Sequence, residues 1–151
     1  MKLAYLETDA SVALQREVVG QGCRLYPAGA GIILRDLRLQ PVLAKSVPLG
    51  QLPGPLHAEY LALVLGLEEA VDLGISGVWA TSDSERLVEA FNGRSVNRAD
   101  GLEEIADRLE QNRAKLVFVT LRWSHGSHRK LKLGGPTADA LARAAVGLGK
   151  R

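Results

Sequence analysis

Acidic residues lie where the sequence predicts the ends of four different structural elements: Asp9, Glu59, Asp83 and Asp139. The first ends a predicted strand, the third lies between a strand and a helix, and the other two fall in first turns of helices. In an open sheet, ligand sites form where strand ends and helix starts converge. Four carboxylates gathered there would repel one another, and Mg²⁺ or Mn²⁺ would relieve that repulsion because both prefer oxygen ligands. Two such ions about 4 Å apart are the usual device for in-line phosphoryl transfer.

Each of these residues also has a simpler, structural interpretation. Asp83 is a good helix cap, and Glu59 and Asp139 complement the dipoles of their helices. Asp9 is harder to explain in this way, because aspartate is disfavoured in strands. By spacing alone the structural interpretation is favoured, since acidic residues are common in first turns, and the metal site stays an alternative.

The elements that must position these acids follow from the hydrophobic pattern. Short apolar runs bounded by glycine, proline or polar residues predict strands over 3–9, 29–35, 41–47, 77–81 and 115–123. Apolar residues at three- and four-residue spacing predict helices over 56–73, 84–92, 101–113 and 137–146. The order β-β-β-α-β-α-α-β-α predicts an α/β fold with a five-stranded mixed sheet and helices on its faces. The first three strands are expected to pair antiparallel, and the later two, reached across helices, parallel to the first.

Length and composition indicate one globular domain. The chain has 151 residues, 46% hydrophobic and 24% charged, which excludes a disordered or fibrous protein. We expect a domain over 1–148, followed by a short basic tail over 149–151. A single cysteine, Cys23, excludes an intramolecular disulfide. No apolar run approaches the roughly 20 residues of a membrane span, and Glu7 and Asp9 argue against a signal peptide, so we expect a cytoplasmic protein with no membrane partner.

Charge is distributed unevenly along the chain. The net charge is +2, but residues 59–110 hold twelve acidic and four basic side chains, whereas residues 122–151 hold one acidic and seven basic ones. Solvated helical faces and a basic tail would explain this distribution. A basic arm that meets phosphates beside an acidic cation site would explain it equally well.

Five short segments stand in order along nearly the whole chain: Thr8-Asp9-Ala10-Ser11, Gly29-Ala30-Gly31-Ile32-Ile33-Leu34, Ala58-Glu59-Tyr60-Leu61-Ala62-Leu63, Thr81-Ser82-Asp83-Ser84 and Ala138-Asp139-Ala140-Leu141-Ala142. Together they resemble the type 1 ribonuclease H family, especially its compact archaeal-like and bacterial members and reverse-transcriptase-like ribonuclease H domains. The resemblance implies a ribonuclease H-like fold. It also implies an endonuclease that cuts the RNA strand of RNA–DNA hybrids and leaves 5′-phosphate and 3′-hydroxyl ends.

The resemblance also implies roles for individual residues. Asp9, Glu59, Asp83 and Asp139 would hold two Mg²⁺ or Mn²⁺ ions, one orienting the attacking water and the other stabilising the leaving 3′-oxygen. A loop histidine would assist catalysis, and His128 lies nearer the family's spacing than His125. We expect the chain to act as a monomer and to contact nucleic acid through seven residues: Ala10, Ser11, His57, Ser84, Arg129, Lys130 and Lys132.

Some positions depart from the family's pattern. Asparagines that help to read the RNA strand are replaced by Pro55 and Leu56, the glycine after the first aspartate is Ala10, and the asparagine before the last acid is Gly135. Selection of RNA usually rests on contacts to the 2′-hydroxyl, so these changes bear on substrate choice more than on hydrolysis. Two alternatives follow: a non-catalytic module that binds nucleic acid or protein, and the same nuclease chemistry on another nucleic acid.

Overall fold

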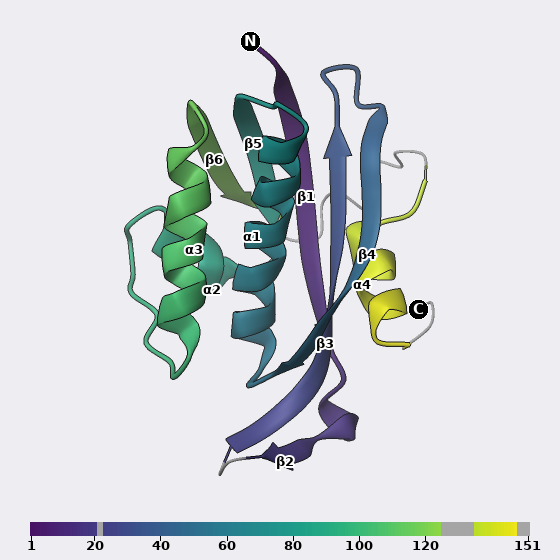
Figure 1. Cartoon of the computed structure of the whole chain (residues 1–151), viewed down its shortest axis with the longest axis vertical. Helices are drawn as coiled ribbons and strands as arrows, with labels where there is room; N and C mark the ends of the chain where they lie inside the picture. The colour runs from purple at the N-terminus through teal and green to yellow at the C-terminus, as the bar shows by residue number, and fades with distance from the viewer. Residues whose placement is uncertain (21–22, 125–134, 148–151) are drawn as a thin grey trace.

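A mixed sheet with helices on both faces forms the protein, in a computed structural model that describes residues 1–20, 23–124 and 135–147. The described strands are β1 (Leu3–Val12), β2 (Val18–Gly20), β3 (Cys23–Arg35), β4 (Pro41–Leu52), β5 (Gly77–Ser82) and β6 (Phe118–Trp123). The described helices are α1 (Pro55–Asp72), α2 (Glu85–Phe91), α3 (Leu102–Ala114) and α4 (Ala138–Ala145), with a short 3₁₀ turn, η1, over Leu14–Arg16. Figure 1 shows α1 and α3 side by side across the strands.

Strand pairing follows the predicted pattern. The order is β2-β3-β1-β5-β6, and β4 also pairs with β3. The pairs β1–β3 and β3–β4 are antiparallel, whereas β1–β5 and β5–β6 are parallel. Strands joined by short connections can pair as hairpins, and strands reached across a helix pair parallel, so the mixed sheet is confirmed.

The predicted number of five strands is wrong for the described residues, which contain six. The extra strand, β2, pairs antiparallel with the first residues of β3, from Cys23 to Leu25. The sequence indicated only an irregular stretch there, because a three-residue strand is too short to show a clear alternation of apolar and polar residues. The β2–β3 hairpin reaches beyond the rest of the sheet at the bottom of Figure 1.

The hydrophobic core lies between the sheet and the layer of α1 and α3. Its largest fully buried side chains include Leu6 on β1, Leu63 and Leu67 on α1, and Val78 on β5. A Cβ at Gly66 of α1 would lie 3.0 Å from the side chains of both Leu6 and Thr8, so this glycine lets the helix pack closely on β1. No described helix combines the length and apolarity that crossing a membrane requires.

Helix α4 packs on the opposite face of the sheet from α1. Side chains alternate along a strand, so Asp9 faces away from the α1 side that Thr8 contacts. Asp9 pairs with Gly31 of β3, and a Cβ at Gly31 would lie 1.9 Å from the carbonyl oxygen of Ala138 in α4. The first acid of the sequence and the helix that carries the last acid therefore meet on the same face.

Candidate active site

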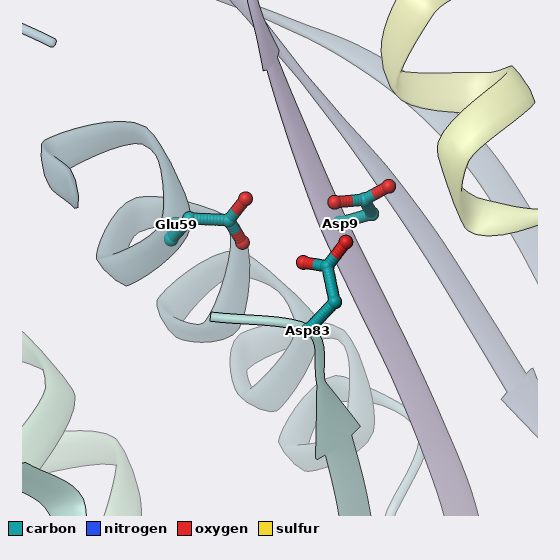
Figure 2. A group of neighbouring side chains, drawn as sticks. All are labelled: Asp9, Glu59 and Asp83. Atoms are coloured by element: carbon teal, nitrogen blue, oxygen red, sulfur yellow. The ribbon is translucent and has the colours of Figure 1, made fainter. Parts of the chain in front are cut away.

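Three of the four predicted acids converge closely. One carboxylate oxygen from each of Asp9, Glu59 and Asp83 lies within 4.8 Å of the others. Figure 2 shows the carboxylates of Asp9 and Asp83 pointing toward each other, with that of Glu59 facing them from α1. Oxygen ligands at this spacing suit a divalent cation such as Mg²⁺ or Mn²⁺.

The end of β5 makes room for this cluster. The parallel ladder between β1 and β5 runs from Leu3–Gly77 to Glu7–Thr81 and stops there. The edge of β1 is therefore free of β5 at Asp9, and Asp83 follows directly after the last residue of β5. The start of α1 brings Glu59 to the same place, although Glu59 lies just beyond the first turn because the helix begins at Pro55. The prediction that Asp9 ends its strand is wrong, because pairing with β3 carries β1 on to Val12. The end of β5 and the start of α1 thus meet beside Asp9, a common place for a ligand site in an open sheet.

The backbone around Asp83 is fixed on several sides. The Ser84 backbone N–H donates to Ser82 Oγ at 3.1 Å, and the Leu87 N–H donates to Ser84 Oγ at 3.4 Å. Trp123 Nε1 donates to the Asp83 carbonyl oxygen at 3.2 Å. The cap of α2 is therefore Ser84 rather than Asp83, and the carboxylate of Asp83 is directed toward the other acids.

Charge repulsion and burial dominate the electrostatics of the site. Burial, together with the charges of Asp83 and Asp139, raises the pKa of Asp9 to about 8. Burial and the charges of Asp9 and Asp83 raise the pKa of Glu59 well above its ordinary value. Asp9 is only 3% exposed, and the Oε2 atom of Glu59 is buried with no hydrogen-bond partner among the described residues. Buried carboxylates that repel one another, with one buried oxygen unpaired, fit the requirements of a bound divalent cation.

Asp139 stands beside this group rather than within it. It lies in the first turn of α4, where the Thr137 side chain caps the helix by accepting from the Ala140 N–H at 3.0 Å. Its charge contributes to the raised pKa of Asp9, so the two carboxylates are neighbours. Of the four acids predicted to converge, three form a tight group and the fourth, Asp139, lies close to Asp9.

Three of the residues expected to contact nucleic acid make contacts within the protein. The Ala10 backbone N–H donates to Asp9 Oδ1 at 2.9 Å, and Ser84 caps α2. His57 is buried, and its Nε2 lies 2.7 Å from the carbonyl oxygen of Asp100, so its ring holds the segment that leads into α3. For these residues, a contact with nucleic acid stays a prediction. Several further candidates lie outside the described residues: His125, His128, Arg129, Lys130, Lys132 and the tail over 149–151.

A cavity of about 360 Å³ lies next to the acids. Ala10 and Ser11 form one side, directly after Asp9, and Pro55 contributes from the start of α1. Arg143 of α4 and Gln15 of η1 also line it. Arg143 is one of the basic residues of 122–151 that the sequence suggested as a phosphate-binding arm, and it follows Asp139 by one helical turn. Nothing in the sequence pattern marked Gln15.

A buried ion pair is the second feature that sequence reasoning missed. Arg35 Nη1 on β3 donates to Glu7 Oε1 on β1 at 2.8 Å, and both residues are 6% exposed. Glu7 precedes Asp9 by two residues and so faces the same side of the sheet. A charged residue inside an apolar strand was a visible signal, but its partner depends on the register of β1 and β3.

Comparisons with known proteins agree with the observed fold. A family model described as reverse transcriptase-like matches residues 19–132, more than half of the chain. No curated protein matches the chain. Among solved structures, the N-terminal RNase H domain of a Mycobacterium tuberculosis protein, fused to maltose-binding protein, is 20% identical, with a TM-score of 0.79 over 97% of this chain and 94% of that one.

Two further structures are similar over most of their length. RNase H1 from the halophilic archaeon Halobacterium salinarum NRC-1 is 20% identical, with a TM-score of 0.77 over 95% of this chain and 96% of that one. LC11-RNase H1, solved in complex with an RNA/DNA hybrid, is 20% identical, with a TM-score of 0.70 over 95% of this chain and 96% of that one. These structural similarities establish the fold, and the family model matches most of the chain. The chain therefore belongs to the reverse transcriptase-like family within the ribonuclease H family and has the fold of type 1 ribonuclease H.

Proposed function

We propose that this protein is a metal-dependent endonuclease that hydrolyses the RNA strand of RNA–DNA hybrids. The observation that carries the proposal is the group of Asp9, Glu59 and Asp83, whose carboxylate oxygens lie within 4.8 Å of one another in a ribonuclease H fold. The similar LC11-RNase H1 was solved with an RNA/DNA hybrid. A site of this kind on this fold supports phosphodiester hydrolysis better than binding alone.

Four acids would hold the cations: Asp9, Glu59, Asp83 and Asp139. The fit rests on their oxygen donors and on the buried, unpaired Oε2 atom of Glu59. When bound, two Mg²⁺ or Mn²⁺ ions would activate the attacking water and stabilise the leaving 3′-oxygen, which leaves a 5′-phosphate and a 3′-hydroxyl.

The chain's own residues prepare the site. Asp9 would ligate a cation only as the deprotonated carboxylate, and its pKa of about 8 means that protonation would compete with cation binding near neutral pH. The Ala10 N–H holds Asp9 Oδ1, and the caps of α2 and α4 fix the backbones that carry Asp83 and Asp139. These contacts hold the acids in place, which would lower the cost of ordering them when a cation binds.

Substrate would lie over the cavity beside the acids. Arg143 supplies a positive charge for a phosphate, and Ser11 supplies a hydroxyl for the sugar-phosphate backbone. The proposal includes two further roles. Phosphate contacts would come from Arg129, Lys130 and Lys132. His128 or His125 would aid proton transfer or product release. Action as a monomer in the cytoplasm is likewise part of the proposal.

One observation favours a second candidate, the same chemistry on another nucleic acid. Pro55 lines the cavity at the first position of α1 and has no backbone N–H to donate. A ribose 2′-hydroxyl near this position would lose a possible partner, so discrimination between RNA and DNA there would be weaker.

Cleavage of a labelled RNA–DNA hybrid, with Mg²⁺, Mn²⁺ or EDTA, tests both candidates. Single-stranded RNA, duplex RNA and duplex DNA run in parallel. Asp9→Asn serves as the blank, and Asp72→Asn, which neutralises an exposed acid at the end of α1, is the matched control. Metal-dependent cutting confined to the RNA strand of the hybrid supports the proposal. Cutting of another substrate favours the second candidate, and no cutting by folded protein with either metal indicates a binding module.

A further inference from the structure

Glu7 and Arg35 are buried opposite charges on the face of the sheet that carries Asp9. In the ladder between β1 and β3, Glu7 pairs with Ile33 and Tyr5 pairs with Arg35, so the ion pair is a diagonal contact. Their side chains are 8% and 7% exposed, and Arg35 Nη1 lies 2.8 Å from Glu7 Oε1. Removing two charges from water costs several kcal/mol per ion, and apolar residues of similar size often serve stability as well. The pair therefore calls for a role besides stability.

The second oxygen of Glu7 reaches α4. Glu7 Oε2 accepts from the backbone N–H of Ala138 at 3.4 Å. Ala138 is the first residue of α4, and its N–H is one of those that a helix start leaves without an internal partner. A carboxylate is also favoured at this end of a helix by the helix dipole. Glu7 thus binds the residue that directly precedes Asp139.

Contacts around the start of α4 leave little freedom. The Ala138 carbonyl is so close to the Gly31 backbone that a Cβ there would lie 1.9 Å away. Thr137 caps the helix through the Ala140 N–H. Of these contacts, Glu7 supplies the side chain that joins β1, the strand of Asp9, to the first turn of α4, and Arg35 fixes where Glu7 lies.

We infer that the Glu7–Arg35 pair is a positioning element that sets the location of Asp139 relative to the other three acids. Asp139 stands outside the group of three, so its place as a fourth ligand depends on where α4 docks. The inference rests on the proposed metal-dependent function and extends it to two residues outside the four acids. Neighbours that orient a metal ligand typically contribute roughly 10–100-fold in metal affinity.

Two neutral double variants separate the hydrogen bond from the charge. Glu7→Gln with Arg35→Met keeps an oxygen that can accept from the Ala138 N–H, whereas Glu7→Leu with Arg35→Met keeps none, and neither leaves an unpaired buried charge. The readout is the Mn²⁺ concentration that half-saturates the rise in unfolding temperature, since a ligand that binds only the folded protein must stabilise it. Glu68→Gln, which breaks the exposed ion pair with Arg108 between α1 and α3, is the control for loss of an ion pair.

We expect the leucine double variant to need roughly tenfold more Mn²⁺ than the wild type, and the glutamine double variant to stay within about twofold. Adding Asp139→Asn to the leucine double variant should weaken Mn²⁺ binding little further, because both changes act through the same ligand. If the leucine variant does not fold, Glu7→Met in the same background removes the oxygens with a more adaptable side chain.

Equal Mn²⁺ responses in the wild type and both double variants would overturn the inference. So would a loss that is fully additive with Asp139→Asn, because Glu7 would then act through something other than Asp139. An equal loss in both double variants would overturn the role of the Ala138 hydrogen bond. A wild-type protein that Mn²⁺ does not stabilise and that cleaves nothing would instead refute the proposed function, and the inference with it.

Discussion

Asp9 pairs with Gly31 across the antiparallel ladder of β1 and β3, and α4 meets the sheet at that same glycine. Residues directly opposite in such a ladder point to the same face. The missing side chain of Gly31 therefore leaves the space in which the start of α4, and with it Asp139, approaches Asp9. A single glycine on one strand controls the distance between acids from two ends of the chain.

Gly31→Ala should displace α4 and lower both stability and activity. A Cβ at this position would lie 1.9 Å from the Ala138 carbonyl oxygen, so the helix must move. Overpacking of this kind costs roughly 1–3 kcal/mol of unfolding free energy, measured by urea denaturation. Ser46→Ala, which removes only a hydrogen bond from β4 to the Leu141 carbonyl of α4, is the control and should retain activity. Full activity in Gly31→Ala would show that the position of α4 does not matter.

The metal-free protein should lose stability as pH rises from about 4 to about 8. In the unfolded chain Asp9 ionises near its ordinary value of 3.8, whereas in the folded protein burial and the neighbouring acids raise its pKa to about 8. Between these values the folded state holds the extra proton, so raising the pH favours unfolding. A difference of one in pKa between the folded and unfolded states corresponds to roughly 1.4 kcal/mol of unfolding free energy. Unfolding by urea in EDTA, at several pH values, measures this slope.

Asp9→Asn should reduce that slope and make the metal-free protein more stable than the wild type at pH 8, because the neutral side chain carries no charge to bury. Some slope should remain from Glu59, whose pKa is also raised. A wild-type protein whose stability is flat between pH 4 and 8 would contradict the electrostatic account of the site.

Affinity for Mn²⁺ should rise with pH. Below about pH 8 a cation must displace the proton of Asp9 before it binds, so affinity increases about tenfold per pH unit for each proton displaced. Calorimetric titration at several pH values, in buffers of different ionisation enthalpy, counts the protons released. Affinity independent of pH between 6 and 8 would contradict the displacement of a proton from Asp9 when the cation binds.

His57→Ala should destabilise the segment that leads into α3. The buried ring loses its hydrogen bond to the Asp100 carbonyl, and its removal leaves a small cavity. We expect a loss of roughly 1–3 kcal/mol in unfolding free energy. Binding of a labelled RNA–DNA hybrid in EDTA is measured on the same sample. Unchanged stability would contradict the structural role, and unchanged hybrid binding by folded variant would contradict the predicted contact with nucleic acid.

Element order and strand direction were predictable from the sequence, because both depend on local patterns and on connection length. Apolar spacing marked α1, whose predicted bounds differ from the observed ones by a single residue at each end. Connections across helices predicted the parallel pairing of β1 with β5. The sequence did not predict β2, because its three residues adopt the strand conformation through pairing with β3 and show no strand pattern of their own.

The acids themselves could be chosen from the sequence, because each was predicted near the end of an element. In the structure Asp9 lies within β1, which continues to Val12, and Glu59 lies beyond the first turn of α1. Only the tertiary structure decided that Asp9, Glu59 and Asp83 come within 4.8 Å of one another, that Asp139 stands just outside them, and that Glu7 and Arg35 join β1, β3 and α4. Local patterns depend on neighbours along the chain. Distances between segments depend on strand register and on close contacts such as that between Gly31 and Ala138, which no local pattern contains.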